Sequence, residues 1–357
     1  MLAAVKPFLR LRRRGLHLAT GEGLSYCPPV QNKPTAIISI PVTEVMRERI
    51  AAVADITTIV PAERARIAEA LATAEGLLGS NQFTLDAVLL NGAPKLRVVS
   101  NFGVGYNNIN VDDASRRGIA VCNTPGVLNA AVVETTFLLM LAASRRMLAN
   151  EAYVRSGGWP RRDAGPALGF DLAGKTLGIL GYGRIGRAVA DAARAFGMKV
   201  IFYDLVRPDP ELPHVPFVPF PVLLRQSDIL TIHVNLTPET THMISAAEFA
   251  QMKPTAWIVN TSRGPVIDQA ALAAALHKGE IAGAALDVLE AEPPDANDPI
   301  LSAPNTILFP HIGSATVETR AAMLELSVAN FIAVLSRNVP DACVNPEVLT
   351  ASGAFRD

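Results

Sequence analysis

Three short segments in the second half of the chain carry side chains that can bind an anion and move a proton. They read NTSRG at 260–264, DVLEAEP at 287–293 and PHIGS at 310–314, and they contain Arg263, Glu292 and His311. A guanidinium binds a carboxylate through two parallel hydrogen bonds, and an imidazole exchanges protons near neutral pH. A carboxylate beside an imidazole favours the protonated, donating form of the ring. The three residue types therefore suit acid-base chemistry on an anionic substrate.

Each segment follows an apolar run that reads as a strand, and ligands of open parallel sheets bind beyond the carboxyl ends of the strands. Singly, each residue has an ordinary explanation: Arg263 as a surface ion-pair residue, Glu292 as a solvated loop acid and His311 as a helix-entry residue. Their joint occurrence at strand ends beside a dinucleotide motif favours an active site.

That motif is GYGRIG at 181–186, between an apolar run at 177–180 and an Ala-rich run with helical spacing at 188–196. Gly181 permits a tight turn, Gly183 leaves room for a pyrophosphate, and Gly186 lets helix and strand pack closely. Asp204 ends the next strand, where an acid accepts hydrogen bonds from the adenosine ribose. The ordered strand, turn, helix, strand and acid predict a dinucleotide site, with a plain turn and a solvated Asp204 as the alternative.

Composition excludes several other classes of protein. Of the 357 residues, 50% are hydrophobic and 18% are charged, which indicates a packed α/β protein. The net charge of −1 gives no positive electrostatic potential that would attract nucleic acid or acidic membranes. No apolar run reaches membrane-span length. Cys27, Cys122 and Cys343 are scattered and no His pair has zinc-site spacing, so we expect reduced thiols in a cytosolic protein and no metal.

Residues 1–33 differ from the rest, because Lys6, Arg10 and Arg12–Arg14 precede the first acid, Glu22. No sustained apolar stretch follows, which argues against a secretory signal. An organelle-targeting peptide, a disordered tail and a start site assigned too early stay open.

The remaining chain alternates apolar and amphipathic runs, which is typical of parallel strands joined by crossover helices. Strands are predicted at 35–40, 56–59, 76–78 and 96–100, with helices at 45–53 and 64–72; after GYGRIG, strands are predicted at 200–203, 229–234, 256–260, 284–286 and 306–308. A helix at 129–146 leads from the first set of strands to the second, and a helix at about 316–336 is predicted to return. This connectivity predicts two doubly wound domains with one inserted in the other.

From about residue 35 to 345 the sequence resembles the D-isomer-specific 2-hydroxyacid dehydrogenases. Besides GYGRIG, the matching segments are GVGYNNI at 103–109, NTPGVL at 123–128, SDILTIHVNLTPET at 227–240, NTSRGPVID at 260–268, DVLEAEPP at 287–294 and PHIGSAT at 310–316. The resemblance implies a Rossmann NAD-binding domain at 134–316 inserted into a flavodoxin-like substrate domain at 34–133 and 317–348.

The resemblance also assigns roles to individual residues. Arg263 would hold the carboxylate and carbonyl oxygen of a 2-oxo acid, His311 would exchange the proton, and Glu292 would support His311. The substrate carboxylate would lie against the backbone N–H groups of Gly103, Val104 and Gly105. The alternative is that these residues form an ordinary loop without a role in binding. The NAD contacts would be Gly181, Gly183, Arg184, Ile185, Gly186, Asp204, His233, Val234, Thr261, Ser262, Asp287 and Gly313.

Two positions depart from the family pattern: Asn107 stands where Asp is common, and Asn235 where Pro is common. Neither removes a proton-transfer group, but Asn235 leaves the shape of the nicotinamide region open. Trp159 is expected to pack in the core or at a subunit interface, with a place near the cleft as the alternative.

These observations predict a cytosolic NAD-dependent reductase of a small 2-oxo acid such as glyoxylate or hydroxypyruvate, and the resemblance implies a homodimer. Phosphoglycerate dehydrogenase and phosphite dehydrogenase are the alternatives within the family. Formate dehydrogenase is disfavoured, because its reaction does not need the Glu292 and His311 pair. An NAD-sensing corepressor on the same scaffold is the alternative from another class.

Overall fold

The computed structural model describes residues 33–161, 165–206 and 215–351, and its fold consists of two parallel-sheet α/β domains, as predicted. The predicted N-terminal extension, apart from Lys33, and Cys27 within it lie outside the described residues. Cys122 and Cys343 are free thiols. In the part of the chain that is described, no helix combines the length and the apolar character needed to cross a bilayer.

The first domain contains a five-stranded parallel sheet in the order β2-β1-β3-β4-β5, which is the flavodoxin-like order. Its strands are β1 (Thr35–Ile38), β2 (Asp55–Thr58), β3 (Gly76–Gly79), β4 (Val98–Asn101) and β5 (Ala120–Cys122), and its crossover helices are α1 (Glu44–Val53), α2 (Arg64–Leu71), α3 (Ala87–Asn91) and α4 (Val111–Arg116).

The second domain contains a six-stranded parallel sheet in the order β11-β10-β9-β8-β6-β7. Its strands are β6 (Thr176–Leu180), β7 (Lys199–Tyr203), β8 (Ile229–Ile232), β9 (Trp257–Asn260), β10 (Gly283–Leu286) and β11 (Thr306–Leu308). Beside β7, Phe217 forms a single parallel bridge with Phe202 where a Rossmann half has its third strand. The order reverses between β6 and β8, so a ligand is expected at the turn that follows β6.

Helices and short 3₁₀ turns connect the strands of this second sheet. They are α8 (Arg184–Ala195), α9 (Phe220–Gln226), α10 (Ala246–Phe249), η1 (Gly264–Val266), α11 (Gln269–Lys278) and η2 (Pro299–Ser302). One core cluster joins Leu230, Phe249 and Leu272, and a second joins Leu139, Val189 and Val259, so helices bury both faces of the sheet.

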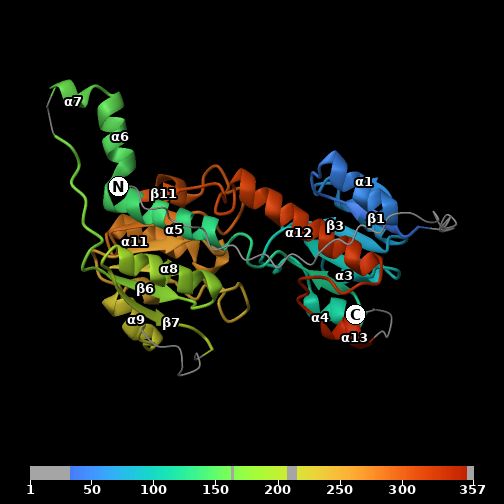
Figure 1. The fold of residues 1–357 in the computed structure, drawn as a ribbon. Coiled ribbons are helices and arrows are strands. Elements are labelled where there is room, and N and C mark those ends of the chain that lie inside the picture. The colour runs from blue at the N-terminus through green and yellow to red at the C-terminus, as the bar shows by residue number, and fades with distance from the viewer. Residues whose placement is uncertain (1–32, 162–164, 207–214, 352–357) are drawn as a thin grey trace, which may run out of the picture. The chain divides into compact units, whose positions relative to one another are not determined.

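Two long helices link the domains (Figure 1). Helix α5 (Asn129–Ser144) packs on α8, β9 and β10, while α12 (Val317–Leu335) packs on α1 and on β3, β4 and β5. The chain therefore returns to the first sheet after completing the second, as predicted. It ends its described part in α13 (Glu347–Ala351).

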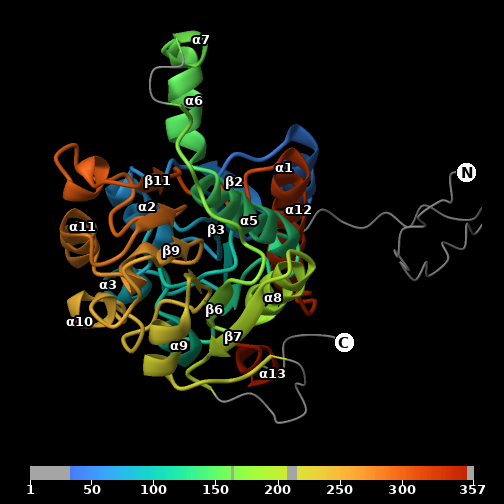
Figure 2. The same cartoon turned by 90° about the vertical axis from the view of Figure 1, so that its left-hand side faces the viewer.

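Several elements were not predicted from the sequence, among them the short helices α3, α4 and α13. Strand β5 has only three residues, which is too short for a periodic pattern. Helices α6 (Met147–Arg155) and α7 (Gly158–Arg161) follow α5 after Arg146, whose φ of 50° is left-handed and ends the predicted helix early. Both lie apart from the sheets in two views (Figures 1 and 2), and no α6 residue is buried.

The packing at the turn from β6 to α8 predicts how two glycine substitutions change the stability of the fold. A Cβ on Gly186 would lie 2.1 Å from the carbonyl oxygen of Gly181, whereas a Cβ on Gly183 would meet no atom within 4 Å. Overpacking typically destabilises a fold by about 1–3 kcal/mol, and a clash with the backbone lies at the upper end of that range. This loss exceeds the roughly 1 kcal/mol by which alanine is favoured over glycine inside a helix. Gly186→Ala should lower the free energy of unfolding in urea by more than Gly183→Ala, the matched control, which loses only the preference for glycine over alanine at the N-cap of α8. Equal stability of the two variants would contradict this packing account.

Candidate active site

A cleft of about 1030 Å³ is lined by residues of both domains. The first domain contributes the loops after β3 and β4, including Ser80, Gln82 and Gly103. The second contributes the loops after β8, β9, β10 and β11, including Arg263 and His311. These loops lie at the carboxyl ends of parallel strands, which is where the sequence predicted a site.

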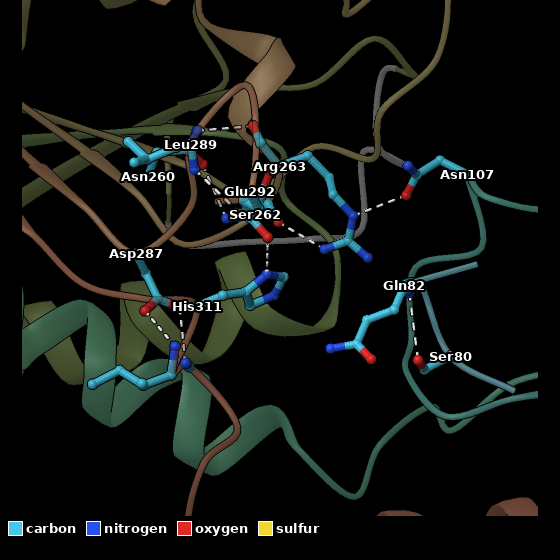
Figure 3. A network of polar contacts seen from close by, with 12 residues as sticks. Ser80, Gln82, Asn107, Asn260, Ser262, Arg263, Asp287, Leu289, Glu292 and His311 are labelled. Carbon is cyan, nitrogen blue, oxygen red and sulfur yellow. Dashed lines mark hydrogen bonds and ion pairs between the residues drawn. The ribbon is translucent and has the colours of Figure 1, made fainter. Parts of the chain in front are cut away.

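His311 and Glu292 form a hydrogen-bonded pair in this cleft (Figure 3). The His311 Nδ1 lies 2.7 Å from one carboxylate oxygen of Glu292, and the other oxygen accepts from the backbone N–H of Leu289 at 3.2 Å. Burial acts to raise the pKa of Glu292, but the hydrogen bond and charge of His311, the Leu289 amide and Arg263 together hold this pKa below its ordinary value. With Nδ1 held, the Nε2 of His311 bonds to no residue in the described chain, so it can face a ligand.

Asp287 holds the loop that carries His311. Its carboxylate oxygens accept from the backbone N–H groups of Ile312 at 2.7 Å and Gly313 at 2.8 Å, while its carbonyl oxygen accepts from the N–H of His311 at 2.8 Å. His311 has a φ of 56°, which is left-handed and uncommon for a residue with a side chain. Burial raises the pKa of Asp287 although the two amides act in the opposite direction. The three bonds keep His311 in this unfavourable conformation.

Arg263 is fixed at two of its three guanidinium nitrogens. Nε donates to the side-chain oxygen of Asn107 at 2.9 Å, and Nη1 donates to the carbonyl of Ser262 at 2.7 Å. The loop itself is tied by Asn260, whose amide donates to the carbonyl of Arg263 at 2.9 Å. Burial lowers the pKa of Arg263, and Glu292 opposes that shift. The remaining nitrogen, Nη2, donates to no atom of the described chain.

The loop after β4 brings three backbone amides to the same cleft. A Cβ on Gly105 would lie 1.7 Å from Nη2 of Arg263, so only glycine leaves the guanidinium its place. The amide of Gly103 donates to the carbonyl of Asn101 at 2.9 Å. The backbone hydrogen bonds of the described chain include none from the N–H of Val104 or Gly105, so these two donors can receive an anion.

The turn between β6 and α8 has room for a diphosphate. Gly181 has a φ of 95°, and a Cβ on it would lie 2.6 Å from the backbone nitrogen of Val234. Around Gly183 the space is open within 4 Å, at the N-terminus of a twelve-residue helix whose first N–H groups attract anions. Asp204 stands at the same turn and accepts from the N–H of Tyr182 at 2.6 Å. These residues fit a nicotinamide dinucleotide.

The predicted site residues therefore separate into two groups. The lining of the cleft includes all three glycine-loop residues and the catalytic candidates, together with Ile185, His233, Val234, Thr261, Ser262, Asp287 and Gly313. Gly181, Gly183, Arg184, Gly186 and Asp204 lie at the β6–α8 turn or at the end of β7, outside this lining. The ring of His233 is turned to the hydroxyl of Thr231 at 2.9 Å, and burial lowers the pKa of His233 to about 3.

Some residues of the cleft were missed or undervalued in the sequence analysis. Asn107, noted only as a departure, holds Arg263. Gln82 and Arg320 line the cleft, and the Arg320 guanidinium lies 5.5 Å from the centre of the Phe102 ring. Neither residue stands in a motif, so only their positions after β3 and at the start of α12 could have indicated them. Trp159 does not line the cleft and its side chain is 66% exposed. It therefore lies neither in the cleft nor in the core.

Comparison with known proteins gives one family. The NAD-binding domain model of the D-isomer-specific 2-hydroxyacid dehydrogenases matches residues 137–313. The glyoxylate reductase of Thermococcus litoralis is 47% identical over 275 residues, which are 75% of this chain and 82% of the relative. The glyoxylate reductase of Korarchaeum cryptofilum is 45% identical over 293 residues, or 81% and 88% of the two chains.

Solved structures agree with these sequence relatives. A glyoxylate reductase from Paecilomyes thermophila superposes with a TM-score of 0.81 at 32% identity, covering 88% of this chain and 99% of the other. An NADPH-dependent glyoxylate/hydroxypyruvate reductase from Sinorhizobium meliloti, solved with NADP and malonate, also has a TM-score of 0.81, at 33% identity over 91% of this chain and 99% of the other.

The lowered pKa of Glu292 predicts a pH-dependent contribution to stability. A carboxylate whose pKa is lower in the folded than in the unfolded chain stabilises the fold above its unfolded pKa of roughly 4.3, and this stabilisation disappears as pH falls through the folded value. The difference in unfolding free energy between the native protein and Glu292→Gln, measured in urea, should therefore be present at pH 6 and decrease progressively as pH falls below the unfolded pKa of roughly 4.3 toward the lower folded pKa. Glu134→Gln, at an exposed position of α5, is the control and should show no such trend. A difference independent of pH would contradict the ion pair.

Proposed function

Because the chain belongs to the D-isomer-specific 2-hydroxyacid dehydrogenases, we propose that it reduces glyoxylate, or a similarly small 2-oxo acid such as hydroxypyruvate, with NADH. Its product is the 2-hydroxy acid, in the D form where that acid is chiral. The relatives named glyoxylate reductase support this substrate. The observation that carries the proposal is the meeting, in one cleft, of the His311–Glu292 pair with Arg263.

In this reaction the bound nicotinamide supplies the hydride to the carbonyl carbon, and the protein must supply a proton to the carbonyl oxygen. His311 donates that proton from Nε2, because its Nδ1 is held by Glu292 at 2.7 Å. Glu292 stabilises the protonated imidazole before transfer and keeps the ring oriented after it. Glu292 stays charged while this happens, since its pKa lies below the ordinary range.

Arg263 and the glycine loop orient the substrate. The Nη2 of Arg263 is available for the carboxylate and the carbonyl oxygen, and it stabilises the negative charge that develops on that oxygen. The amides of Val104 and Gly105 receive the carboxylate from the first domain. Because the substrate then touches both domains, binding favours closure of the cleft and exclusion of water.

Three further assignments form part of the proposal. The substrate domain comprises residues 34–133 and 317–348, and the NAD-binding domain comprises residues 134–316. The packing of α12 on β3, β4 and β5 supports these boundaries.

The protein is a cytosolic homodimer. Helices α6 and α7 and the segment after them support the dimer, because they expose the large apolar side chains of Leu148, Val154, Trp159 and Leu168, and aromatic residues such as Trp159 are enriched at interfaces.

The activity test measures the oxidation of NADH after glyoxylate is added, detected as a loss of NADH absorbance. His311→Asn should lower kcat by roughly 10² or more at every pH while NADH still binds. Arg263→Lys keeps the charge but not the two aligned hydrogen bonds, and should cost about 2–3 kcal/mol in kcat/KM. Arg225→Lys, at an exposed position of α9, is the matched control. Near-native kinetics in both site variants, or no turnover with any 2-oxo acid, would sink the proposal.

The cofactor preference is a separate prediction. Asp204 would face the 2′-phosphate of NADPH with like charge, so NADH should be preferred by roughly a hundredfold in kcat/KM. Asp204→Asn keeps an acceptor for the Tyr182 amide and removes the charge, so it should reduce the preference by about tenfold or more. Arg207, which could weaken the preference, lies outside the described residues.

Steady-state kinetics with both cofactors measure this ratio. Asp191→Asn, at an exposed position two turns into α8, removes the same charge without removing the carboxylate that accepts from the Tyr182 amide, and should change the ratio by much less than Asp204→Asn does. Equal use of NADH and NADPH by the native protein would show that Asp204 does not select the cofactor.

A further inference from the structure

Gln82 reaches into the cleft from the side opposite the proton donor. It belongs to the loop after β3 and lines the cleft with its neighbours Ser80 and Asn81. In Figure 3 its side chain extends from the first domain toward the space that His311 and Arg263 face from the second. A ligand held by those two residues would therefore present its far end to the Gln82 amide.

The loop that carries Gln82 is held in place by its backbone and by a buried side chain. The Nδ2 of Asn108 donates to the carbonyl of Ser80 at 3.3 Å and to that of Phe83 at 3.0 Å, so it closes the loop on both sides of Gln82. The Phe83 ring is buried, and the guanidinium of Arg64 lies 5.6 Å from its centre. The position of Gln82 is thus determined without any contribution from its own side chain.

The Gln82 amide itself is available. Its backbone N–H donates to the Ser80 hydroxyl at 3.4 Å, and its side-chain oxygen and nitrogen take part in no hydrogen bond within the described chain. A carboxamide presents both a donor and an acceptor, which matches an alcohol and does not match a methyl group. When the cleft excludes water, an amide facing a methyl group loses its solvent bonds without replacement.

We propose that Gln82 is a specificity-determining residue that hydrogen-bonds the hydroxyl group on the third carbon of a 2-oxo acid. The protein then prefers a 3-hydroxy-2-oxo acid, such as hydroxypyruvate, over pyruvate, which differs by lacking that hydroxyl. Glyoxylate has no third carbon, so its reduction is indifferent to Gln82. This inference rests on the proposed function and adds the residue that selects among its substrates.

The experiment compares kcat/KM for hydroxypyruvate, pyruvate and glyoxylate in the native protein, in Gln82→Leu and in Gln251→Leu. Gln251 lies outside the lining of the cleft, in the turn after α10, and donates to the carbonyl of Ala247 in that helix, so it is the matched control. The native protein should favour hydroxypyruvate over pyruvate by about tenfold or more, and Gln82→Leu should reduce that ratio by roughly tenfold. Glyoxylate kinetics should stay within about twofold of native in Gln251→Leu, and in Gln82→Leu they should fall by less than the hydroxypyruvate kinetics do.

The outcomes separate the two levels of the argument. An unchanged hydroxypyruvate-to-pyruvate ratio in Gln82→Leu, with normal glyoxylate turnover, overturns the role of Gln82 and leaves the proposed function intact. An equal loss on all three substrates in Gln82→Leu also overturns it, because a selective contact cannot act on glyoxylate. Absence of turnover with every substrate in the native protein overturns the proposed function and this inference with it.

Discussion

The site depends on the carboxylate of Asp287, which joins the end of β10 to the loop after β11. It accepts from the amides of Ile312 and Gly313, and its backbone carbonyl accepts from His311. Burial raises the pKa of Asp287, so the folded chain bears a cost for keeping this group in place. The amides of Ile312 and Gly313 oppose that cost, and the same hydrogen bonds hold His311 at a φ of 56°, a conformation that persists only where its surroundings determine it.

Contacts join the loop after β11 to the loop after β10, and that loop to the one after β9. His311 bonds Glu292, Glu292 accepts from the amide of Leu289, and a Cβ on Gly264 would lie 1.8 Å from the Leu289 carbonyl oxygen. Gly264 directly follows Arg263, so the guanidinium loop lies against the carboxylate loop only because residue 264 has no side chain. Contacts thus join the ends of β9, β10 and β11, and they place the proton donor and the anion-binding group beside each other.

Much of this could be predicted from the sequence, because the information was local. Apolar runs, the GYGRIG turn and the loops with Arg263, Glu292 and His311 are continuous segments whose chemistry can be read directly. The short strand β5 and the helix α6 were missed, since three residues carry no periodicity and α6 buries no apolar face. Gln82 and Arg320 were missed for another reason: they enter the cleft through the packing of distant segments, and neither stands in a motif.

Asn107 shows how a departure from a family pattern becomes intelligible only in three dimensions. An aspartate there would pair with the half-buried guanidinium of Arg263 and neutralise part of its charge before substrate arrives. The neutral amide oxygen of Asn107 still accepts from Nε at 2.9 Å and so fixes the plane of the guanidinium. Burial already lowers the pKa of Arg263, which means that its charge is poorly solvated. Asn107 thus orients the guanidinium without adding a second negative charge to that of Glu292, and Nη2 is left for the carboxylate of a bound ligand.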